Sequence, residues 1–465
     1  MSTSKSTIEV VERLRSEWPG RIIGPGEPGY DERRNGFYGG YDRHPAVIVL
    51  ATTASDVQAA VSVARDNGLE LAVRSGGHSV AGHSATEGGV LLDLSAMRGL
   101  EIDAAGRFAW VEPGLTAGEY TSSVLERGLV TGFGDTASVG IGGITLGGGV
   151  GFLSRKFGLT IDSLLAADVV TADGQLRRVD GQNHTDLFWA IRGGGGNFGV
   201  VTRLKLELRE LGTVFGGILV LPGTPEALTG LLAAASAAPD DLSLIANILS
   251  PAPPMPFLPP EHHGGKVILV SIVFAGPVDR GPDVVAPFRA LGPIADLLRP
   301  MSYSEIFPPD DPNYHPVGIS RNLFVDRLDR AAAETIFAAM DGSDAPMRAC
   351  QIRVLGGAIS RVPADATAYA FRDRPIMVNV AAICGPDGVT AARRDWVVGL
   401  SDVLRGADHA AYVNFIGDEG ADRVRDAYPP ATWDRLAAIK ARYDPDNLFR
   451  LNQNVTPGRP SGERH

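Results

Sequence analysis

Several features that define other protein classes are missing from this sequence. Its 465 residues include only two cysteines, Cys350 and Cys384, which are too few for a disulfide framework or a metal site. No run of 18 uninterrupted apolar residues occurs, so we expect no membrane-spanning helix. The N-terminus has neither the basic nor the apolar region of a secretory signal, and this favours a cytoplasmic location.

Clustered positive charge is also missing. The chain has 43 basic and 54 acidic residues, a net charge of −11, and lysine or arginine never occurs more than two in a row. A polyanionic partner such as nucleic acid is therefore not expected. The length suggests two or three domains with buried cores, and the sequence leaves the oligomeric state open.

Glycine, in contrast, is abundant and clustered. An apolar stretch, 69–73, leads into Arg74-Ser75-Gly76-Gly77-His78-Ser79, where two glycines allow close backbone approach to a ligand. Considered alone, a histidine such as His78 is more often a structural or capping residue than a reactive one. A second and denser cluster, with eight glycines between Gly134 and Gly151, makes a reactive role for His78 more plausible.

The second cluster is a poor free-standing element, because each ordered glycine costs about 0.5–1 kcal/mol relative to alanine. Backbone N–H groups turned toward phosphate or carbonyl oxygens of a large ligand would offset this cost. The alternative, a flexible linker, fits poorly because Val139, Ile141, Ile144 and Leu146 alternate with the glycines. The pattern therefore predicts a ligand-binding loop.

The two clusters, together with the segment Asp186–Thr202, resemble the FAD-linked oxidases of the berberine bridge enzyme-like and 6-hydroxy-D-nicotine oxidase-like type. The resemblance covers nearly the whole chain and implies the vanillyl-alcohol oxidase fold, also called the PCMH-type FAD-binding fold. The implied fold class is α+β. A two-part FAD-binding domain, residues 1–211 and 411–465, would be interrupted at 212–410 by a substrate domain with an antiparallel sheet covered by helices.

A different nucleotide site is suggested by Gly194-x-Gly196-x-x-Gly199, which matches the dinucleotide fingerprint in its letters. A helix-like segment precedes these glycines and a strand follows, whereas the nicotinamide-binding site requires the strand first. We therefore reject that interpretation. In the resembling family, this segment lies along the adenosine diphosphate portion of the flavin.

Local patterns predict the main elements. Helices are expected at 55–67, capped by Ser55, at 116–127, and at the N-terminus behind a capping box formed by Ser6 and Glu9, with Ile8, Val11, Leu14 and Trp18 on one side. Strands are expected at 45–50, 69–73, 90–94, 108–111, 162–171, 176–179 and 200–208, and in the substrate domain at 242–249, 266–274, 351–355 and 376–383. The proline-dense segment 251–260 is expected to be an exposed or lid-like loop, and the tail 457–465 to be disordered.

The resemblance also implies the position of the cofactor. It places the following residues at the FAD: Arg74, Ser75, Gly76, Gly77, His78, Ser79, His83, Pro113, Gly114, Thr136, Val139, Gly140, Gly142, Gly143, Gly148, Gly149, Gly151, Phe152, Gly199, Val200, Tyr412, Asn414, Asn452 and Asn454. His78 would bond to the 8α-methyl carbon of the flavin, and the alternative is a noncovalent flavin resting against it. Many relatives add a cysteine linkage where this chain has Thr136, and a hydroxyl is a far weaker nucleophile than a thiol at neutral pH. We therefore expect one linkage, which slightly disfavours an oligosaccharide substrate.

The implied reaction is the transfer of a hydride from a small alcohol, amine or natural-product substrate to flavin N5, followed by reoxidation by O2 to give H2O2. Relatives often place a carboxylate base where this chain has Gln351 or Arg353. Tyr412, expected to share one face of a strand with Asn414, is the best remaining base, and a buried core tyrosine is the alternative. Arg353 would orient an anionic or carbonyl group, or form a structural salt bridge.

Three secondary assignments stay open at this stage. His83 caps the pyrophosphate loop or is only a turn residue. Val139 lies near the position that governs oxygen access in relatives, or is core packing. The pair Arg155-Lys156 is expected on a solvated face.

Three functions are therefore compatible with the sequence. An O2-using oxidase is favoured over a dehydrogenase or oxygenase on the same scaffold. A non-catalytic flavin-binding protein is the third reading, which the residues at 351 and 353 keep open.

Overall fold

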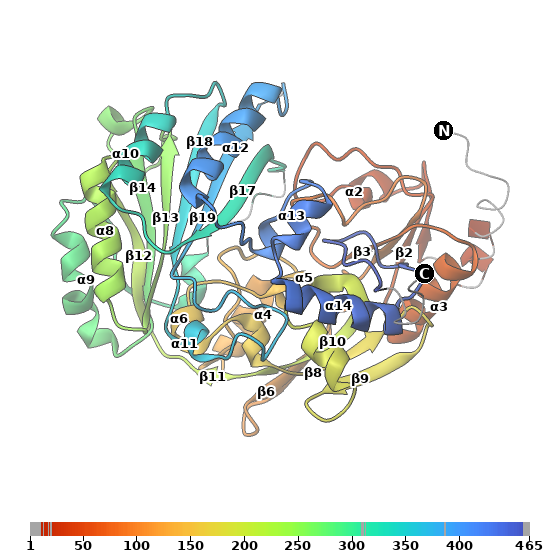
Figure 1. The fold of residues 1–465 in the computed structure, drawn as a ribbon. Helices are drawn as coiled ribbons and strands as arrows, with labels where there is room; N and C mark the ends of the chain where they lie inside the picture. The colour runs from red at the N-terminus through yellow and green to blue at the C-terminus, as the bar shows by residue number, and fades with distance from the viewer. Residues whose placement is uncertain are drawn as a thin grey trace.

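The computed structural model describes residues 11–458 except for 13, 17, 19–20, 308–310, 312 and 386. In Figure 1 a large sheet with its helices lies on one side of the molecule, and several smaller sheets lie on the other. Of the predicted N-terminal helix, Ser6, Ile8 and Glu9 fall outside the described residues. Leu14 is buried in the core beneath the first sheet, with Val11 and Trp18 packed against it. Within the tail predicted to be disordered, 459–465 are likewise outside the described residues.

The first sheet carries the first glycine cluster at its edge. Its strands are β1 (Ile22–Ile23), β2 (Val47–Leu50), β3 (Leu71–Arg74) and β4 (Val90–Asp93), in the order β1-β2-β4-β3. Strands β2 and β3 both run parallel to β4, and helix α3 (Ala54–Asp66) connects them, which confirms the predicted βαβ-like entry. The short strand β1 precedes the strand that was expected to be first.

Helix α3 begins one residue earlier than predicted, and its N-cap lies two residues earlier. Thr53, rather than Ser55, is the N-cap: its hydroxyl accepts the Asp56 N–H, and the Asp56 carboxylate accepts the Thr53 N–H. Both Ser55 and Thr53 have the local spacing for such a capping box. Arg21, far away in sequence, decides between them because it binds the same Asp56 carboxylate at 2.5 Å.

A five-stranded antiparallel sheet follows, in the order β5-β6-β10-β8-β9. Its strands are β5 (Leu100–Asp103), β6 (Phe108–Val111), β8 (Leu164–Val170), β9 (Leu176–Asp180) and β10 (Val200–Glu207). The predicted hairpin around Asp173 and Gly174 is confirmed as the connection between β8 and β9. The other elements of this part are α2 (Tyr30–Arg34), α4 (Ala117–Leu125), β7 (Leu129–Val130), α5 (Ile141–Gly147), α6 (Ser154–Phe157), the 3-10 helix η1 (Thr160–Ser163), α7 (Thr185–Ala190), the 3-10 helix η2 (Gly195–Phe198) and β11 (Arg209–Glu210).

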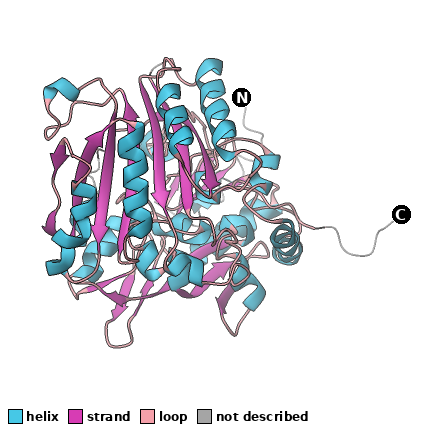
Figure 2. Ribbon diagram, turned by 60° about the vertical axis from the view of Figure 1, so that its left-hand side comes forward, coloured by secondary structure: helices cyan, strands magenta, loops and turns pink. Residues whose placement is uncertain are grey.

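Residues 214–384 contribute all strands of the large sheet, which is antiparallel as expected. The strands are β12 (Val214–Pro222), β13 (Leu242–Ser250), β14 (Val267–Phe274), β15 (Ala295–Asp296), β16 (Arg299–Met301), β17 (Val317–Val325), β18 (Met347–Val354) and β19 (Ile376–Cys384). Helices α8 (Pro225–Ala237), α9 (Gly281–Arg289), α10 (Arg330–Ala339) and α12 (Ala391–Arg405) cover one face (Figure 2).

The two faces of this sheet differ in chemistry. On the helix-covered face Ile352 and Val378 pack with Leu231, Ile336 and Val397 in one apolar core. Because side chains alternate along a strand, the residues between them point to the opposite face. That opposite face turns toward the glycine clusters.

The proline-dense segment does not act as a lid in this structure. Ala252 and Leu258 are buried against Val220 and Val267 at the far end of the sheet. Instead of a purely exposed loop, the segment is a partly buried cover of that end. Its prolines exclude regular structure without preventing apolar packing.

The last part of the chain returns to the cofactor side. This part contains the 3-10 helix η6 (Val413–Phe415) and the helices α13 (Ala421–Arg425) and α14 (Pro430–Tyr443). The remaining short elements lie between the strands of the large sheet: η3 (Pro260–His262), η4 (Val278–Arg280), η5 (Tyr303–Ile306) and α11 (Ala358–Arg361). In Figure 1 the blue α14 lies beside the yellow elements of the N-terminal half, and it contacts α7 and η2. Among the described residues, no helix combines the length and apolar character needed to cross a bilayer.

The expectation that Arg155 and Lys156 lie on a solvated face is wrong. Arg155 is buried and donates to the carbonyl oxygens of Leu355 at 2.6 Å and Ala238 at 3.1 Å. Lys156 forms an ion pair with Asp241 at 2.9 Å. The two cations therefore join α6, next to the second glycine cluster, to the large sheet, a contact that their neighbours in the sequence do not reveal.

Candidate functional site

A cavity of about 470 Å³ lies between the glycine clusters and the polar face of the large sheet. This is within the usual range for small-molecule and cofactor sites. Residues of both clusters, of the 194–201 segment, of β17 to β19 and of the C-terminal part line it. Parts of the chain that are hundreds of residues apart thus form one wall.

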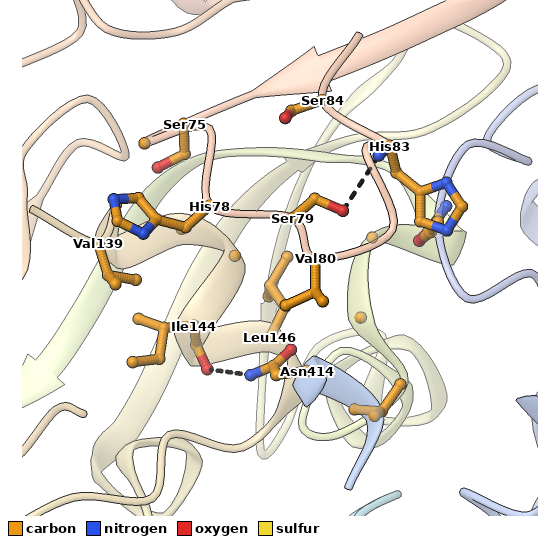
Figure 3. A pocket seen from close by; sticks show the side chains of 18 of the residues that line it. Ser75, His78, Ser79, Val80, His83, Ser84, Val139, Ile144, Leu146 and Asn414 are labelled. Atoms are coloured by element: carbon orange, nitrogen blue, oxygen red, sulfur yellow. Dashed lines mark hydrogen bonds between the residues drawn. The ribbon is translucent and has the colours of Figure 1, made fainter. Parts of the chain in front are cut away.

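The glycines at the cavity allow backbone to approach backbone. A Cβ atom on Gly76 would overlap the Gly140 backbone, so the two clusters pack together only without side chains at these positions. Gly77 has φ +73°, a left-handed conformation that turns the chain just after β3. The turn brings His78 into the cavity wall, where Figure 3 shows its ring on the same side as Val139.

An aromatic neighbour orients His78. The Phe37 ring stacks on the imidazole with 4.1 Å between centroids and 15° between planes. Tyr38 also lines the cavity, and burial raises the pKa of its hydroxyl to about 12. One side of the cavity at His78 is therefore aromatic and uncharged.

Most of the predicted site residues come together at this cavity. Those in its wall are Ser75, Gly76, Gly77, His78, Ser79, His83, Pro113, Thr136, Val139, Gly140, Gly142, Gly143, Gly199, Val200, Gln351, Arg353, Tyr412, Asn414 and Asn452. Those outside the wall are Arg74, Gly114, Gly148, Gly149, Gly151, Phe152 and Asn454. Arg74 and Gly148, two members of the second group, support neighbouring parts of the site.

Two examples show how that support works. The buried Arg74 forms an ion pair with Asp93 at 3.0 Å and holds the end of β3. A Cβ on Gly148 would lie 2.9 Å from the Tyr412 ring, so the missing side chain leaves room for that ring. Arg74 and Gly148 thus help to position the end of β3 and the Tyr412 ring.

Tyr412 and Asn414 do not lie on a strand as predicted. Tyr412 precedes the single turn η6, because its N–H binds the Asn322 side chain at 2.6 Å instead of a neighbouring strand. The two side chains nevertheless meet, since Asn414 Nδ2 donates to Tyr412 Oη at 2.9 Å. Asn414 also binds the Ile144 carbonyl at 3.2 Å (Figure 3), which fixes it to helix α5.

The Tyr412 hydroxyl is an acceptor of two hydrogen bonds. The Gly149 N–H donates to it at 2.8 Å, in addition to Asn414. Burial raises the pKa of Tyr412, and the two donors oppose this rise by stabilising the phenolate. Among the described residues no acceptor receives the phenolic proton, so the hydroxyl can direct it toward a bound molecule.

Arg353 and Gln351 both lie on β18 and line the cavity, as expected. Arg353 is 3% exposed, pairs with Asp135 and places its guanidinium 4.7 Å above the Phe415 ring centroid. The structure therefore contains a salt bridge of Arg353, which was one of the two alternatives for this residue. Its Nε and Nη1 atoms have no partner, and buried donors of this kind carry a free-energy cost until they are satisfied.

His83 lies in the wall and remains neutral. Its backbone N–H donates to Ser79 Oγ at 3.1 Å (Figure 3), which closes the turn after His78. Burial, helped by the Arg43 guanidinium, lowers the pKa of the imidazole to about 4. At neutral pH this ring adds no charge to the cavity.

Sequence reasoning missed several wall residues, among them Phe37, Tyr38, Asp135, Ser320 and Asn379. Asp135 is inside the second glycine cluster and could have been noted as its one carboxylate. The others carry no local motif. Only the register between β17, β18 and β19 places Ser320 and Asn379 near Gln351.

The glycine-lined cavity between a two-part α+β unit and a helix-covered antiparallel sheet defines a PCMH-type flavoprotein oxidoreductase. A family model described as FAD binding domain matches residues 45–180, and one described as berberine and berberine like matches 411–456. The chain is 31% identical over 455 residues to (R)-6-hydroxynicotine oxidase of Paenarthrobacter nicotinovorans, covering 94% of this chain and 97% of the relative. The chain therefore belongs to the berberine bridge enzyme-like family of FAD-linked oxidases.

Other comparisons agree with this assignment. Berberine bridge enzyme-like 6 of Arabidopsis thaliana is 28% identical, with 89% of this chain and 81% of the relative covered. The crystal structure of 6-hydroxy-D-nicotine oxidase from Arthrobacter nicotinovorans superposes with a TM-score of 0.83 at 28% identity, over 95% of this chain and 98% of the other. Xylooligosaccharide oxidase from Myceliophthora thermophila, at 23% identity and a TM-score of 0.86, shares the fold over 98% of this chain and 100% of the other.

The residues at the cavity fit FAD. Apart from chain neighbours and the backbone of α5, no protein atom lies within 4 Å of a Cβ built on Gly143. Asn452 alone approaches those built on Gly195 and Gly196, so these backbones face open space. Backbone N–H groups and neutral amides suit a pyrophosphate held without lysine or arginine. The aromatic and apolar residues around His78 suit the flat ring system.

Proposed function

We propose that this protein is an oxidase that carries FAD on a single covalent linkage to His78 and oxidises a small alcohol, amine or natural-product molecule. In this proposal residues 1–211 and 411–465 form the FAD-binding domain, and 212–410 form the substrate domain. The observation that carries it is the His78 imidazole, stacked on Phe37 in the wall of a cavity that fits FAD. Thr136 lines the same cavity and offers no thiol for a second linkage.

The chain's own residues would bind and orient the substrate and accept its proton. When bound, FAD would supply the electron sink for this two-electron oxidation, with O2 as the final electron acceptor and H2O2 as the product. Tyr412 would take the proton from the substrate O–H or N–H, because its oxygen is held by Gly149 and Asn414 and lines the cavity. Arg353 would hold the substrate wall in place through its pair with Asp135.

The covalent linkage is tested with purified protein. We expect the intact mass to exceed that of the polypeptide by one FAD, and the denatured band to fluoresce in acid under ultraviolet light. In His78→Ala both signals should disappear. Flavin released on denaturation of the unmodified protein would show that the linkage is absent, and protein purified without any flavin would overturn the whole proposal.

Phe37 is predicted to position His78 for this linkage. Without the stacked ring the imidazole gains rotational freedom, so in Phe37→Ala we expect covalent attachment to slow by about tenfold or more. The measurement is the fraction of protein with the FAD mass at fixed times after expression begins. Tyr314→Ala is the matched control, because Tyr314 meets Phe37 edge-on at 6.3 Å and lies outside the cavity wall. Normal attachment in Phe37→Ala would show that the stacking has no role.

A further inference from the structure

A row of four carboxamides crosses the large sheet, and two of its members line the cavity. Asn247, Gln351, Asn379 and Asn322 occupy directly opposed positions on the adjacent strands β13, β18, β19 and β17. Directly opposed residues point to the same face of a sheet. Because Gln351 and Asn379 line the cavity, the row lies on the face turned toward the flavin site.

Hydrogen bonds fix the two ends of this row. Gln351 Nε2 donates to Asn247 Oδ1 at 3.0 Å, which engages the amide nitrogen of Gln351 on the side of β13. Asn322 is completely buried and accepts the Tyr412 N–H. Asn379, between these two contacts, has a buried Oδ1 atom without a partner. Asn322 Nδ2 also lacks a partner, but Asn322 does not line the cavity. The half-buried Gln351 and Asn379, which do, are therefore the members that can bind a ligand.

The charge at this wall is balanced. Of the described residues that line the cavity, two are aspartate, glutamate, lysine or arginine: Asp135 and Arg353. Their side chains form an ion pair with each other. Carboxamides do not titrate, so this part of the wall stays neutral at every pH. A carboxylate, phosphate or ammonium entering here would lose hydration and would meet charges that are already paired with each other. The Nε and Nη1 donors of Arg353 are the groups of this pair that still lack a partner.

We propose that Gln351 and Asn379 select a neutral substrate that carries a hydrogen-bond donor beside a carbonyl oxygen, such as an amide, a lactam or a hydroxy ketone. The inference rests on the proposed function and adds the substrate class to it. The two carboxamides bind the donor and the acceptor of the substrate, and Phe37, Tyr38 and Phe415 enclose its apolar part. The row replaces charge recognition with neutral hydrogen bonding.

The test compares three probes that share a phenyl ring: benzamide, which is neutral, benzoate and benzylammonium. Their dissociation constants are measured by calorimetric titration of the flavin-loaded protein. We expect benzamide to bind about tenfold or more tightly than either charged probe, a difference of about 1.4 kcal/mol or more. Tighter binding of a charged probe, or no binding of any probe, overturns the inference.

Near-isosteric variants locate the effect. In Gln351→Glu we expect the affinity for benzamide to fall and the affinity for benzylammonium to rise, by about tenfold each, because a carboxylate then faces the ligand. Asn379→Asp makes the same change from β19 and serves if the first variant does not fold. Asn247→Asp is the control: it still accepts from Gln351 Nε2 but lies outside the cavity wall, so it should keep the benzamide preference.

The outcome also separates this inference from the proposed function. Protein that retains covalent FAD but shows the same probe preference in Gln351→Glu and Asn379→Asp as in the unmodified chain overturns the inference alone. Protein that contains no FAD overturns the proposed function and the inference with it. Flavin content is therefore measured by absorbance on every titrated sample.

Discussion

Replacing Tyr412 with phenylalanine is expected to lower kcat by about 10²–10⁴-fold, the range associated with the loss of a general base. The change removes one oxygen and leaves the ring in its packing with Tyr369 and Phe415. Burial raises the pKa of the Tyr412 hydroxyl above its usual value near 10. A base acts only when deprotonated, so we expect kcat to increase with pH from neutrality into the alkaline range. This increase should be absent in the variant.

Tyr369→Phe is the matched control for this prediction. Tyr369 lies 6.0 Å from Tyr412 between ring centroids, is buried, and has a hydroxyl without a partner. It is not part of the cavity wall, so losing its hydroxyl should leave kcat and the pH profile unchanged. If Tyr412→Phe instead lowers only thermal stability and keeps the pH dependence of kcat, then Tyr412 is a structural core residue and another group takes the proton.

Replacing Lys440 with methionine is expected to destabilise the FAD-binding part by about 3–5 kcal/mol, because it leaves a buried carboxylate unpaired. Lys440 and Asp444 are both 0% exposed and form an ion pair at 2.6 Å. Lys440 Nζ also donates to the carbonyl oxygens of Asn197 and Phe449, which line the cavity. The measurement is the denaturant midpoint for loss of flavin absorbance and circular dichroism.

The double variant Lys440→Met with Asp444→Asn tests the physical cause. Asp444 now accepts the Leu448 N–H at Oδ1 and the Phe449 N–H at Oδ2. The asparagine keeps one acceptor oxygen for these two groups and brings no charge. We therefore expect it to recover a large part of the lost stability. Equal stability of the single and double variants would mean that the lost contacts to Asn197 and Phe449, and not the unpaired charge, cause the effect.

The sequence predicts those parts of the fold that depend on neighbouring residues. The turn at Asp173 and Gly174 defines its hairpin locally, alternation identifies β10, and a mostly apolar run marks most of β19. Strands β12 and β17 were not predicted. Two glycines interrupt β12, and β17 carries Ser320 and Asn322 where a buried strand normally has apolar side chains. Their pairing partners, distant in the sequence, hold them as strands.

The same division applies to the site. The glycine clusters predict the cofactor side because close backbone approach requires glycine at fixed local positions, as at Gly76 and Gly140. The substrate side has no such constraint. Phe37 stacks on His78 across 41 positions, and Asn379 meets Gln351 only through the register of β18 and β19. No short pattern reports contacts of this kind.

The order of the wall segments along the chain has a consequence for synthesis on the ribosome. Residues 412–416, Phe449 and residues 451–453 belong to the cavity wall, and Lys440 connects their region to the segment around Asn197. A nascent chain can form the first two sheets early, since domains fold from the N-terminus during translation. The cavity proposed to hold the flavin, however, is incomplete until almost the whole polypeptide has emerged. On this proposal, FAD binds late, after almost the whole chain has been synthesised.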